Sequence, residues 1–145
     1  VSALAEDAEE QPENWYEAGV RLEEANPELA EGAYRKAIEL EPAHADAYVN
    51  LTALLCDAGR CEEALALCND AIAHCPNVAL LHFNRGVALE ALGHIESAIA
   101  EYEQCLRLDR TLADAHYNLG RLYHERGRGQ DAIRHLSEYR RLHKS

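Results

Sequence analysis

Residues that interrupt helices are scarce in this sequence. Its 145 residues include only four prolines and eight glycines, and long helix-compatible runs separate the prolines at Pro12, Pro27, Pro42 and Pro76. Valine, isoleucine and threonine are sparse, whereas alanine, leucine and glutamate are abundant. This balance predicts an all-α protein, because the abundant residues are good helix formers and the sparse ones favour strands.

Long apolar runs are also missing. No stretch of about 18 apolar residues occurs, so the sequence predicts no membrane-spanning helix and no membrane partner. The opening stretch VSALAEDAEEQPEN lacks the basic start and the apolar centre of a secretory signal. The five cysteines are scattered and odd in number, which fits reduced thiols in a cytoplasm better than a disulfide framework. We therefore expect a cytoplasmic protein whose residues 1–11 form an acidic, frayed segment.

Positive charge is scarce and unevenly placed. The formal net charge is −12. Residues 1–42 carry 12 acidic and 3 basic side chains, residues 43–109 carry 10 and 3, and residues 110–145 carry 4 and 8. The phosphate backbone of a nucleic acid would repel most of such a chain, so nucleic acid is not an expected partner. The basic last segment is interpreted as a solvated helix face.

The chain repeats itself at a period of 34 residues. Three windows that begin at Ala47, Leu81 and Ala115 superpose without a gap. Three sets of residues then coincide: Asn50, Asn84 and Asn118; Gly59, Gly93 and Gly127; Ala64, Ala98 and Ala132. Within each copy the glycine separates two helical patterns, as expected of a residue that accepts the left-handed conformation at a helix end.

A more diverged copy precedes these three. It contains Trp15 and Ala30 in register with the later copies, but one residue is missing from its internal turn. The turn is rebuilt there as Asn26-Pro27, which predicts an N-cap followed by proline at the first helical position. The sequence thus contains four copies of one helical hairpin.

The repeating unit resembles the tetratricopeptide repeat, whose pattern places aromatic, small and alanine residues at fixed offsets. The matching positions are Trp15, Tyr48, His82 and His116 (first aromatic); Gly19, Thr52, Gly86 and Gly120 (small); Ala30, Ala64, Ala98 and Ala132 (alanine); and Tyr34, Cys68, Tyr102 and Leu136 (second aromatic). Thr52 departs from the pattern, and Cys68 and Leu136 fill the second aromatic position without an aromatic ring. The resemblance implies an all-α, right-handed superhelical solenoid of about four helix-turn-helix repeats. A single domain would span residues 12–145, with repeats at about 12–44, 45–78, 79–112 and 113–145.

In this family the first helices line a concave groove that holds extended peptides. Mapped by position, the candidate peptide-binding residues are Asn50, Asn84 and Asn118, the apolar residues that precede them (Val49, Phe83 and Tyr117), and Val87, Arg121 and His124. An amide has both a donor and an acceptor, so such a ladder can bind a peptide backbone whatever its side chains. The alternative is that each asparagine bonds a neighbouring helix or its own turn.

The charge of the predicted groove indicates the kind of partner. Its rim contains Glu17, Asp46, Asp57, Glu90 and Asp114, which favour a neutral or basic peptide with apolar anchors. A clamp for a carboxylate tail would need several basic residues on this surface, and only Arg121 is available. The expected partner is therefore a protein or peptide segment, and not an acidic tail.

No motif for catalysis, cofactor binding or metal binding is found. Phosphate-binding glycine loops, nucleophile elbows and zinc-protease motifs are missing. Cys61, Cys68 and Cys75 lie seven residues apart and lack the closer pairing of a zinc site. The sequence therefore predicts a non-enzymatic protein without cofactor or metal. Cys56 maps to the predicted groove and is a candidate reactive thiol.

Two hypotheses stay open beside an interaction module. The first is self-assembly into a homo-oligomer through the terminal repeats, because Leu136 and Leu142 are expected to be uncovered and the acidic start would attract the basic end. The second is that the chain is the regulatory arm of a larger enzyme or transcription regulator. Its start at Val1 instead of methionine motivates that interpretation.

Overall fold

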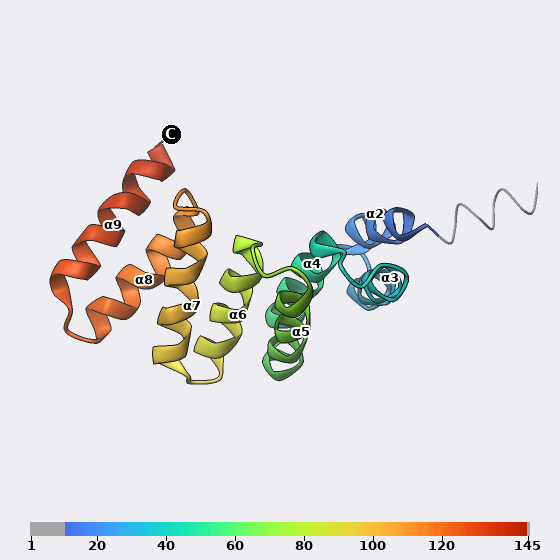
Figure 1. Cartoon of the computed structure of the whole chain (residues 1–145), viewed down its shortest axis with the longest axis horizontal. Helices are drawn as coiled ribbons and strands as arrows, with labels where there is room; N and C mark the ends of the chain where they lie inside the picture. The colour runs from blue at the N-terminus through green and yellow to red at the C-terminus, as the bar shows by residue number, and fades with distance from the viewer. Residues whose placement is uncertain (1–10, 145) are drawn as a thin grey trace, which may run out of the picture. The chain divides into compact units, whose positions relative to one another are not determined.

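The computed structural model describes residues 11–144, so the segment predicted to fray lies, apart from Gln11, outside the described residues. The described part of the chain consists of eight α-helices and contains no strand (Figure 1). The helices are α2 (Pro12–Leu22), α3 (Pro27–Leu40), α4 (Ala45–Asp57), α5 (Cys61–His74), α6 (Ala79–Ala91), α7 (Ile95–Leu108), α8 (Ala113–Glu125) and α9 (Gly129–Lys144). The predicted all-α class of helix-turn-helix repeats is confirmed. The chain divides into two compact units, with the boundary between Pro76 and Asn77.

Glycine turns join the helices within the last three hairpins. Gly59, Gly93 and Gly127 have φ angles of 77°, 87° and 74°. At the first of these turns the N–H of Gly59 donates to the carbonyl of Cys56 at 3.0 Å, and the N–H of Arg60 donates to that of Leu55 at 2.8 Å. These bonds satisfy carbonyls that the end of a helix leaves unpaired.

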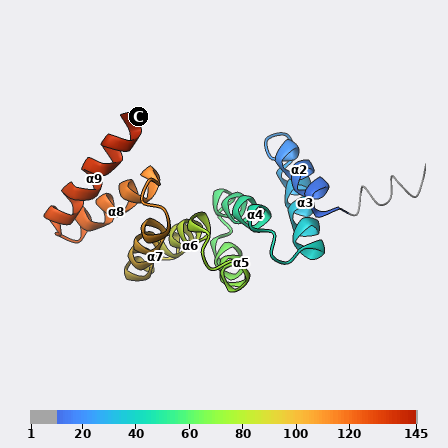
Figure 2. The same cartoon turned by 45° about the horizontal axis from the view of Figure 1, so that its top comes forward.

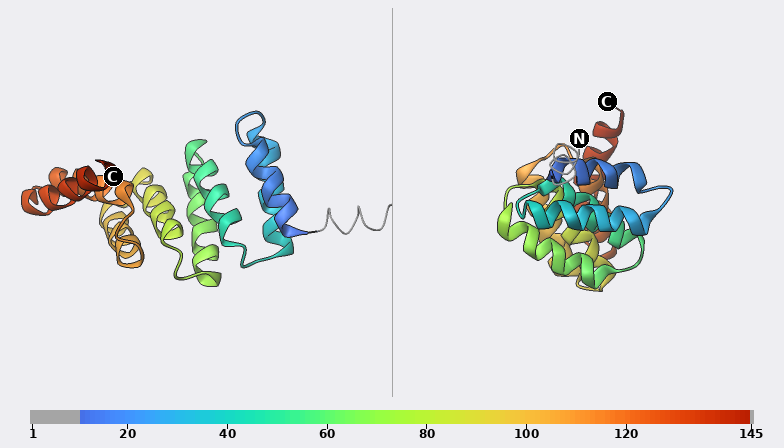
Figure 3. Two further views of the ribbon diagram at one scale, coloured as in Figure 1. Left: turned by 90° about the horizontal axis from the view of Figure 1, so that it is seen from above. Right: turned by 90° about the vertical axis from the view of Figure 1, so that its right-hand side faces the viewer.

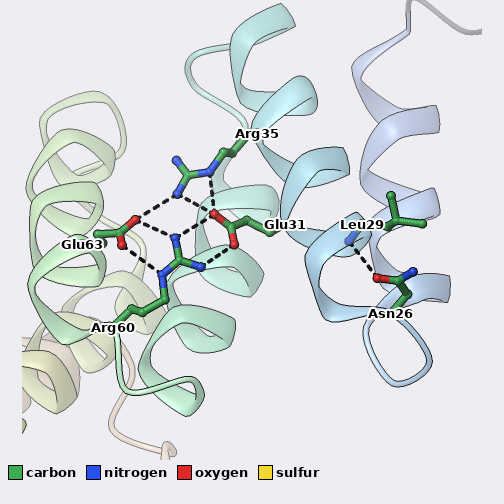
Figure 4. Close-up of polar contacts among 6 residues, drawn as sticks. All are labelled: Asn26, Leu29, Glu31, Arg35, Arg60 and Glu63. Atoms are coloured by element: carbon green, nitrogen blue, oxygen red, sulfur yellow. Dashed lines mark hydrogen bonds and ion pairs between the residues drawn. The ribbon is translucent and has the colours of Figure 1, made fainter.

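The first hairpin uses a different turn, as its sequence predicts. The side chain of Asn26 accepts the N–H of Leu29 at 3.2 Å, and Pro27 is the first residue of α3 (Figure 4). The cap satisfies one of the free N–H groups at the start of α3.

In the first unit, α2 packs along α3 and α4 packs along α5, as the second view shows (Figure 2). The repeated alanines Ala30 and Ala64 are completely buried. Gly19 on α2 lies directly against the ring of Tyr34 on α3, where a Cβ atom would be 2.5 Å from Cε1. The small and the large residue of the repeat pattern therefore form a fitted pair.

The second unit repeats this packing. Helices α6 and α7 lie side by side, as do α8 and α9 (Figure 3). Its core cluster consists of Ala98, Ile99 and Tyr102 from α7, Leu119, Leu122 and Tyr123 from α8, and Ala132 from α9. Gly86 lies against the ring of Tyr102, and Gly120 lies against the side chain of Leu136. In each hairpin the second helix packs against the first, and the first helices carry the candidate site.

Candidate functional site

In the first unit, Asn50 of α4 is held by two tyrosines of the preceding hairpin. Its Nδ2 group donates to the hydroxyl oxygens of Tyr16 on α2 and Tyr34 on α3, at 3.3 Å each. The Tyr34 hydroxyl donates its proton to Glu23, so it meets Asn50 with a lone pair. Burial and the contact with Glu23 raise the pKa of Tyr34, which keeps this hydroxyl protonated. Val49, the residue before Asn50, is half-buried.

In the second unit, Asn118 of α8 has the same relation to Tyr102 of α7. The Tyr102 hydroxyl donates to Oε1 of Glu90 at 3.1 Å and also hydrogen-bonds the Asn118 side chain. Because the only hydroxyl proton goes to Glu90, Tyr102 accepts from the Nδ2 group of Asn118. Burial, followed by the Glu90 charge, raises the pKa of Tyr102. Arg121 completes this group, since its Nη2 lies 2.7 Å from Oε2 of Glu90.

Both units thus contain the same arrangement, which we call the amide triad. Its members are Glu23, Tyr34 and Asn50 in the first unit, and Glu90, Tyr102 and Asn118 in the second. Each triad joins the two helices of one hairpin to the first helix of the next. Asn50 and Asn118 therefore make the interhelical bond that the sequence left open as an alternative. Within the described residues, the triad engages the Nδ2 group of each asparagine and not its amide oxygen.

Sequence reasoning missed the triad, although a signal for it was present. A carboxylate lies four residues after the small position in the first and third copies, as Glu23 and Glu90. Only these two copies have tyrosine at the second aromatic position. The second and fourth copies instead place Cys56 and His124 where the carboxylate would be, so the alternation is visible in the sequence.

The candidate residues of α6 lie deeper than those of α4 and α8. Asn84 is only 7% exposed. The ring of Phe83 is tilted against that of Tyr102, with centroids 5.6 Å apart, and Val87 packs against the same core cluster. Phe83 and Val87 are thus engaged in the packing of their own unit.

The candidate residues at the other end of this unit are accessible. Tyr117 is 45% exposed, and His124 is exposed as well. The Tyr117 ring lies 5.2 Å from that of Tyr139 on α9, which stacks on His143. A pocket of about 410 Å³ is lined by Tyr117, Leu136, Tyr139, Arg140, His143 and Lys144. The residue that precedes Asn118 in α8 is therefore an exposed aromatic residue at a pocket.

Two sequence profiles of a known repeat family match the chain. One, described as tetratricopeptide repeat, matches residues 17–79, and the other, described as TPR repeat, matches residues 91–127. The chain belongs to the tetratricopeptide repeat family. Its helical hairpins are those of a protein-interaction scaffold.

Similar proteins contain the same tetratricopeptide repeats. The TPR repeat-containing thioredoxin TTL4 of Arabidopsis thaliana is 40% identical over 78 residues, which cover 54% of this chain and 11% of that protein. The chain thus spans about a tenth of the length of this relative. Among solved structures, pilF of Pseudomonas aeruginosa aligns with a TM-score of 0.86 at 20% identity, over 92% of this chain and 61% of that one. MamA of Desulfovibrio magneticus RS-1 aligns with a TM-score of 0.77 at 22% identity, over 93% and 77%. These structures share the tetratricopeptide fold.

The surroundings of Cys56 argue against the prediction of a reactive thiol there. This side chain is partly buried in the tetratricopeptide packing of α4, and burial raises the pKa of its thiol to about 11. A thiol that stays protonated is a poor nucleophile. In the described residues, histidine, cysteine and carboxylate side chains nowhere gather into a group of three that could hold a metal ion. Among the described helices, none combines the length and apolarity needed to cross a membrane.

Proposed function

We propose that these tetratricopeptide repeats bind an extended peptide along the first helices of their hairpins, without catalysis. The observation that carries the proposal is the amide triad. Tyrosine hydroxyls fix the Nδ2 groups of Asn50 and Asn118, and each amide oxygen is left to accept a peptide N–H. A side chain already held in place loses less conformational entropy on binding than a free one. The proposed peptide-binding residues are Val49 and Asn50 in the first unit, and Tyr117, Asn118, Arg121 and His124 in the second.

Apolar anchoring is proposed at Tyr117. Its exposed ring, together with Leu136 and Tyr139, lines the pocket of about 410 Å³. An apolar side chain of a peptide would bury its surface there, and aromatic residues in such pockets often dominate binding energies. Asn118, the next residue of α8, is proposed to bind the peptide backbone while Tyr117 anchors the side chain.

The charge of the first unit supports a neutral or basic partner. Its described residues, 11–76, include 13 acidic and 4 basic side chains. Glu17, Asp46 and Asp57 are all exposed on α2 and α4, where the peptide is proposed to lie. Basic residues of a peptide would be attracted to these carboxylates, and an acidic segment would be repelled.

The test compares two variants of one triad. Asn118→Ala and Tyr102→Phe both break the bond between these residues, but only Asn118→Ala removes the amide. For the tightest peptide from a panel of extended sequences, we expect Asn118→Ala to weaken binding about tenfold, the size of a lost hydrogen bond to a partner. Tyr102→Phe is expected to keep most of the affinity. If Asn118→Ala binds as tightly as the unmodified chain, the amide does not contact the peptide.

Self-association is a second candidate function, because a face of α9 is exposed whereas the equivalent face of α7 is buried. Ile133 on α9 is 68% exposed, whereas Ile99, at the equivalent position on α7, is 8% exposed. Ile99 packs in the core cluster with residues of α8. A helix from a second copy of the chain would cover Ile133 in the same way.

Light scattering tests the second candidate. The mass is expected to grow with concentration, and Ile133→Ser is expected to reduce that growth. The matched control is Leu29→Ser, which changes an exposed leucine of α3. If the unmodified chain stays monomeric at high concentration, the proposed interface on α9 is contradicted. It is also contradicted if Ile133→Ser and Leu29→Ser reduce the growth in mass equally.

A further inference from the structure

A polar pocket in the second unit lies apart from the proposed peptide site. It has a volume of about 780 Å³ and is lined by Arg110, Thr111, His116, Arg134, Glu138 and Arg141. Arg110 and Thr111 belong to the turn between α7 and α8, His116 lies in the first half of α8, and the others lie on α9. Helices α7, α8 and α9 follow one another in Figure 1. The pocket is of the size that small-molecule sites usually have.

Hydrogen bonds fix the floor of this pocket. Nε2 of His116 lies 3.0 Å from the carbonyl oxygen of Arg110. Because a carbonyl only accepts, the imidazole donates from Nε2 and holds the turn in place. Nδ1 of His116 lies 3.0 Å from Nδ1 of the buried His135 and accepts from it when both rings are neutral. The turn that carries Arg110 is thus attached to the buried part of α8 and α9.

The pocket has an excess of positive charge. Three guanidinium groups face one carboxylate, Glu138, which holds Arg141 through a contact of 2.7 Å. Arg134 lies 3.4 Å from Asp131, a carboxylate that also binds Arg128. Within the described residues, no hydrogen bond or ion pair engages the guanidinium of Arg110. The pocket lining therefore has a formal charge of about +2 in a chain that is acidic as a whole.

We propose that this pocket binds a phosphate monoester. Such a group carries a charge of about −1.5 to −2 at neutral pH, which matches the excess in the pocket. Guanidinium groups bind phosphate oxygens with paired hydrogen bonds. The lining contains three of them, on Arg110, Arg134 and Arg141. The lining residues are all polar or charged. The phosphate is carried either by a small molecule or by a phosphorylated side chain of a protein.

Titration calorimetry with the whole chain at low ionic strength tests the proposal. The probes are O-phosphoserine and a short neutral peptide that contains phosphoserine, each beside its unphosphorylated form. Both phosphorylated probes are expected to bind, and their unphosphorylated forms are not. Tighter binding of the peptide assigns the phosphate to a protein partner, and equal affinity assigns it to a small molecule. If the phosphorylated and unphosphorylated forms behave alike, the proposal is wrong.

Variants locate the binding. Arg110→Gln combined with Arg134→Gln is expected to weaken phosphoserine binding by roughly tenfold or more. Arg107→Gln is the matched control, because Arg107 is exposed on α7 outside the pocket. If the double variant and the Arg107→Gln control lose the same affinity for phosphoserine, the phosphate does not bind in this pocket. Glu138→Gln gives an independent result, since it removes the one carboxylate of the lining and is expected to tighten binding. Unchanged or weaker binding by Glu138→Gln also overturns the proposal.

Discussion

The ring of Tyr34 on α3 lies so close to Gly19 on α2 that position 19 has no room for a side chain. A Cβ atom on Gly19 would lie 2.5 Å from Cε1 and 2.6 Å from Cδ1 of the tyrosine. Tyr34 is completely buried and cannot move aside without disturbing the core. Gly19→Ala is therefore expected to lower the free energy of unfolding by about 1–3 kcal/mol, the usual cost of overpacking.

A matched glycine on α3 provides the control for this first prediction. Gly32 has no atom within 4 Å of the position that its Cβ would take. Gly32→Ala is expected to raise the free energy of unfolding by about 0.5–1 kcal/mol, because alanine is the better helix former. Urea unfolding curves of the two variants measure both effects. A stabilised Gly19→Ala variant would show that the close contact is not tight.

Much of the fold follows from the repeat period, because each hairpin is specified within one copy. The glycine turns and the Asn26 cap depend on residues a few positions apart, and the sequence was enough to predict them. The departures at Thr52 and Cys68 are explained only by the structure. Both are completely buried, which shows that the core accepts them at these positions.

The candidate site was less predictable, because contacts between helices decide it. The spacing placed Asn50, Asn84 and Asn118 on equivalent positions of first helices. It did not reveal that tyrosines bind two of them, or that Asn84 is buried. Tyr34 and Tyr102 lie on other helices than the asparagines that they bind, and a pattern within one helix does not contain that information.

The stability of the second unit is expected to fall in mild acid because of His135. Burial lowers its pKa below 6.5, and the charges of His116 and Arg134 act in the same direction, against that of Glu103. Between the folded pKa and about 6.5, the unfolded chain therefore binds a proton that the folded chain does not. This contribution is fully present above pH 6.5 and is lost as the pH falls toward the folded pKa, by up to about 1.4 kcal/mol per pH unit.

Unfolding curves at pH 7.5, 6.5 and 5.5 measure this dependence. The His135→Gln variant has no imidazole at this position and is expected to show a smaller decrease. An equal slope in the variant and the unmodified chain would assign the effect to other groups.

The ion-pair network of the first unit is expected to make a small, salt-dependent contribution. Glu31 on α3 accepts from Arg60 at 2.6 Å and from Arg35 at 3.0 Å, and Glu63 pairs with both arginines (Figure 4). Arg60 is the main cause of the lowered pKa of Glu31. Because solvent screens this network, Glu31→Gln is expected to cost only about 0.5–1 kcal/mol.

High salt separates the network from packing. The difference between Glu31→Gln and the unmodified chain is expected to shrink in about 1 M NaCl, where the Debye length is about 3 Å. Glu39→Gln is the control, since Glu39 has one loose contact of 3.8 Å with Lys36. A cost that salt leaves unchanged would indicate lost packing instead of lost charge pairing.

Cys56 is expected to react slowly with alkylating reagents. A thiol with a pKa of about 11 contains roughly a hundredfold less thiolate at neutral pH than one with the ordinary value of 9.0. Mass spectrometry after iodoacetamide treatment is expected to show much faster labelling of Cys56 in urea than in the folded chain. Equal rates in the two states would show that burial does not protect this thiol.

The side-chain amide resonances of Asn50 and Asn118 test the proposed peptide contact most directly. In a titration with the tightest peptide of the panel, followed by ¹⁵N-resolved NMR, both NH₂ pairs are expected to shift along with the backbone amides of α4 and α8. The shift is expected because each amide oxygen accepts a peptide N–H while its Nδ2 stays on tyrosine. If a bound peptide leaves both NH₂ pairs unchanged, the asparagines only hold the hairpins together, and the peptide binds elsewhere.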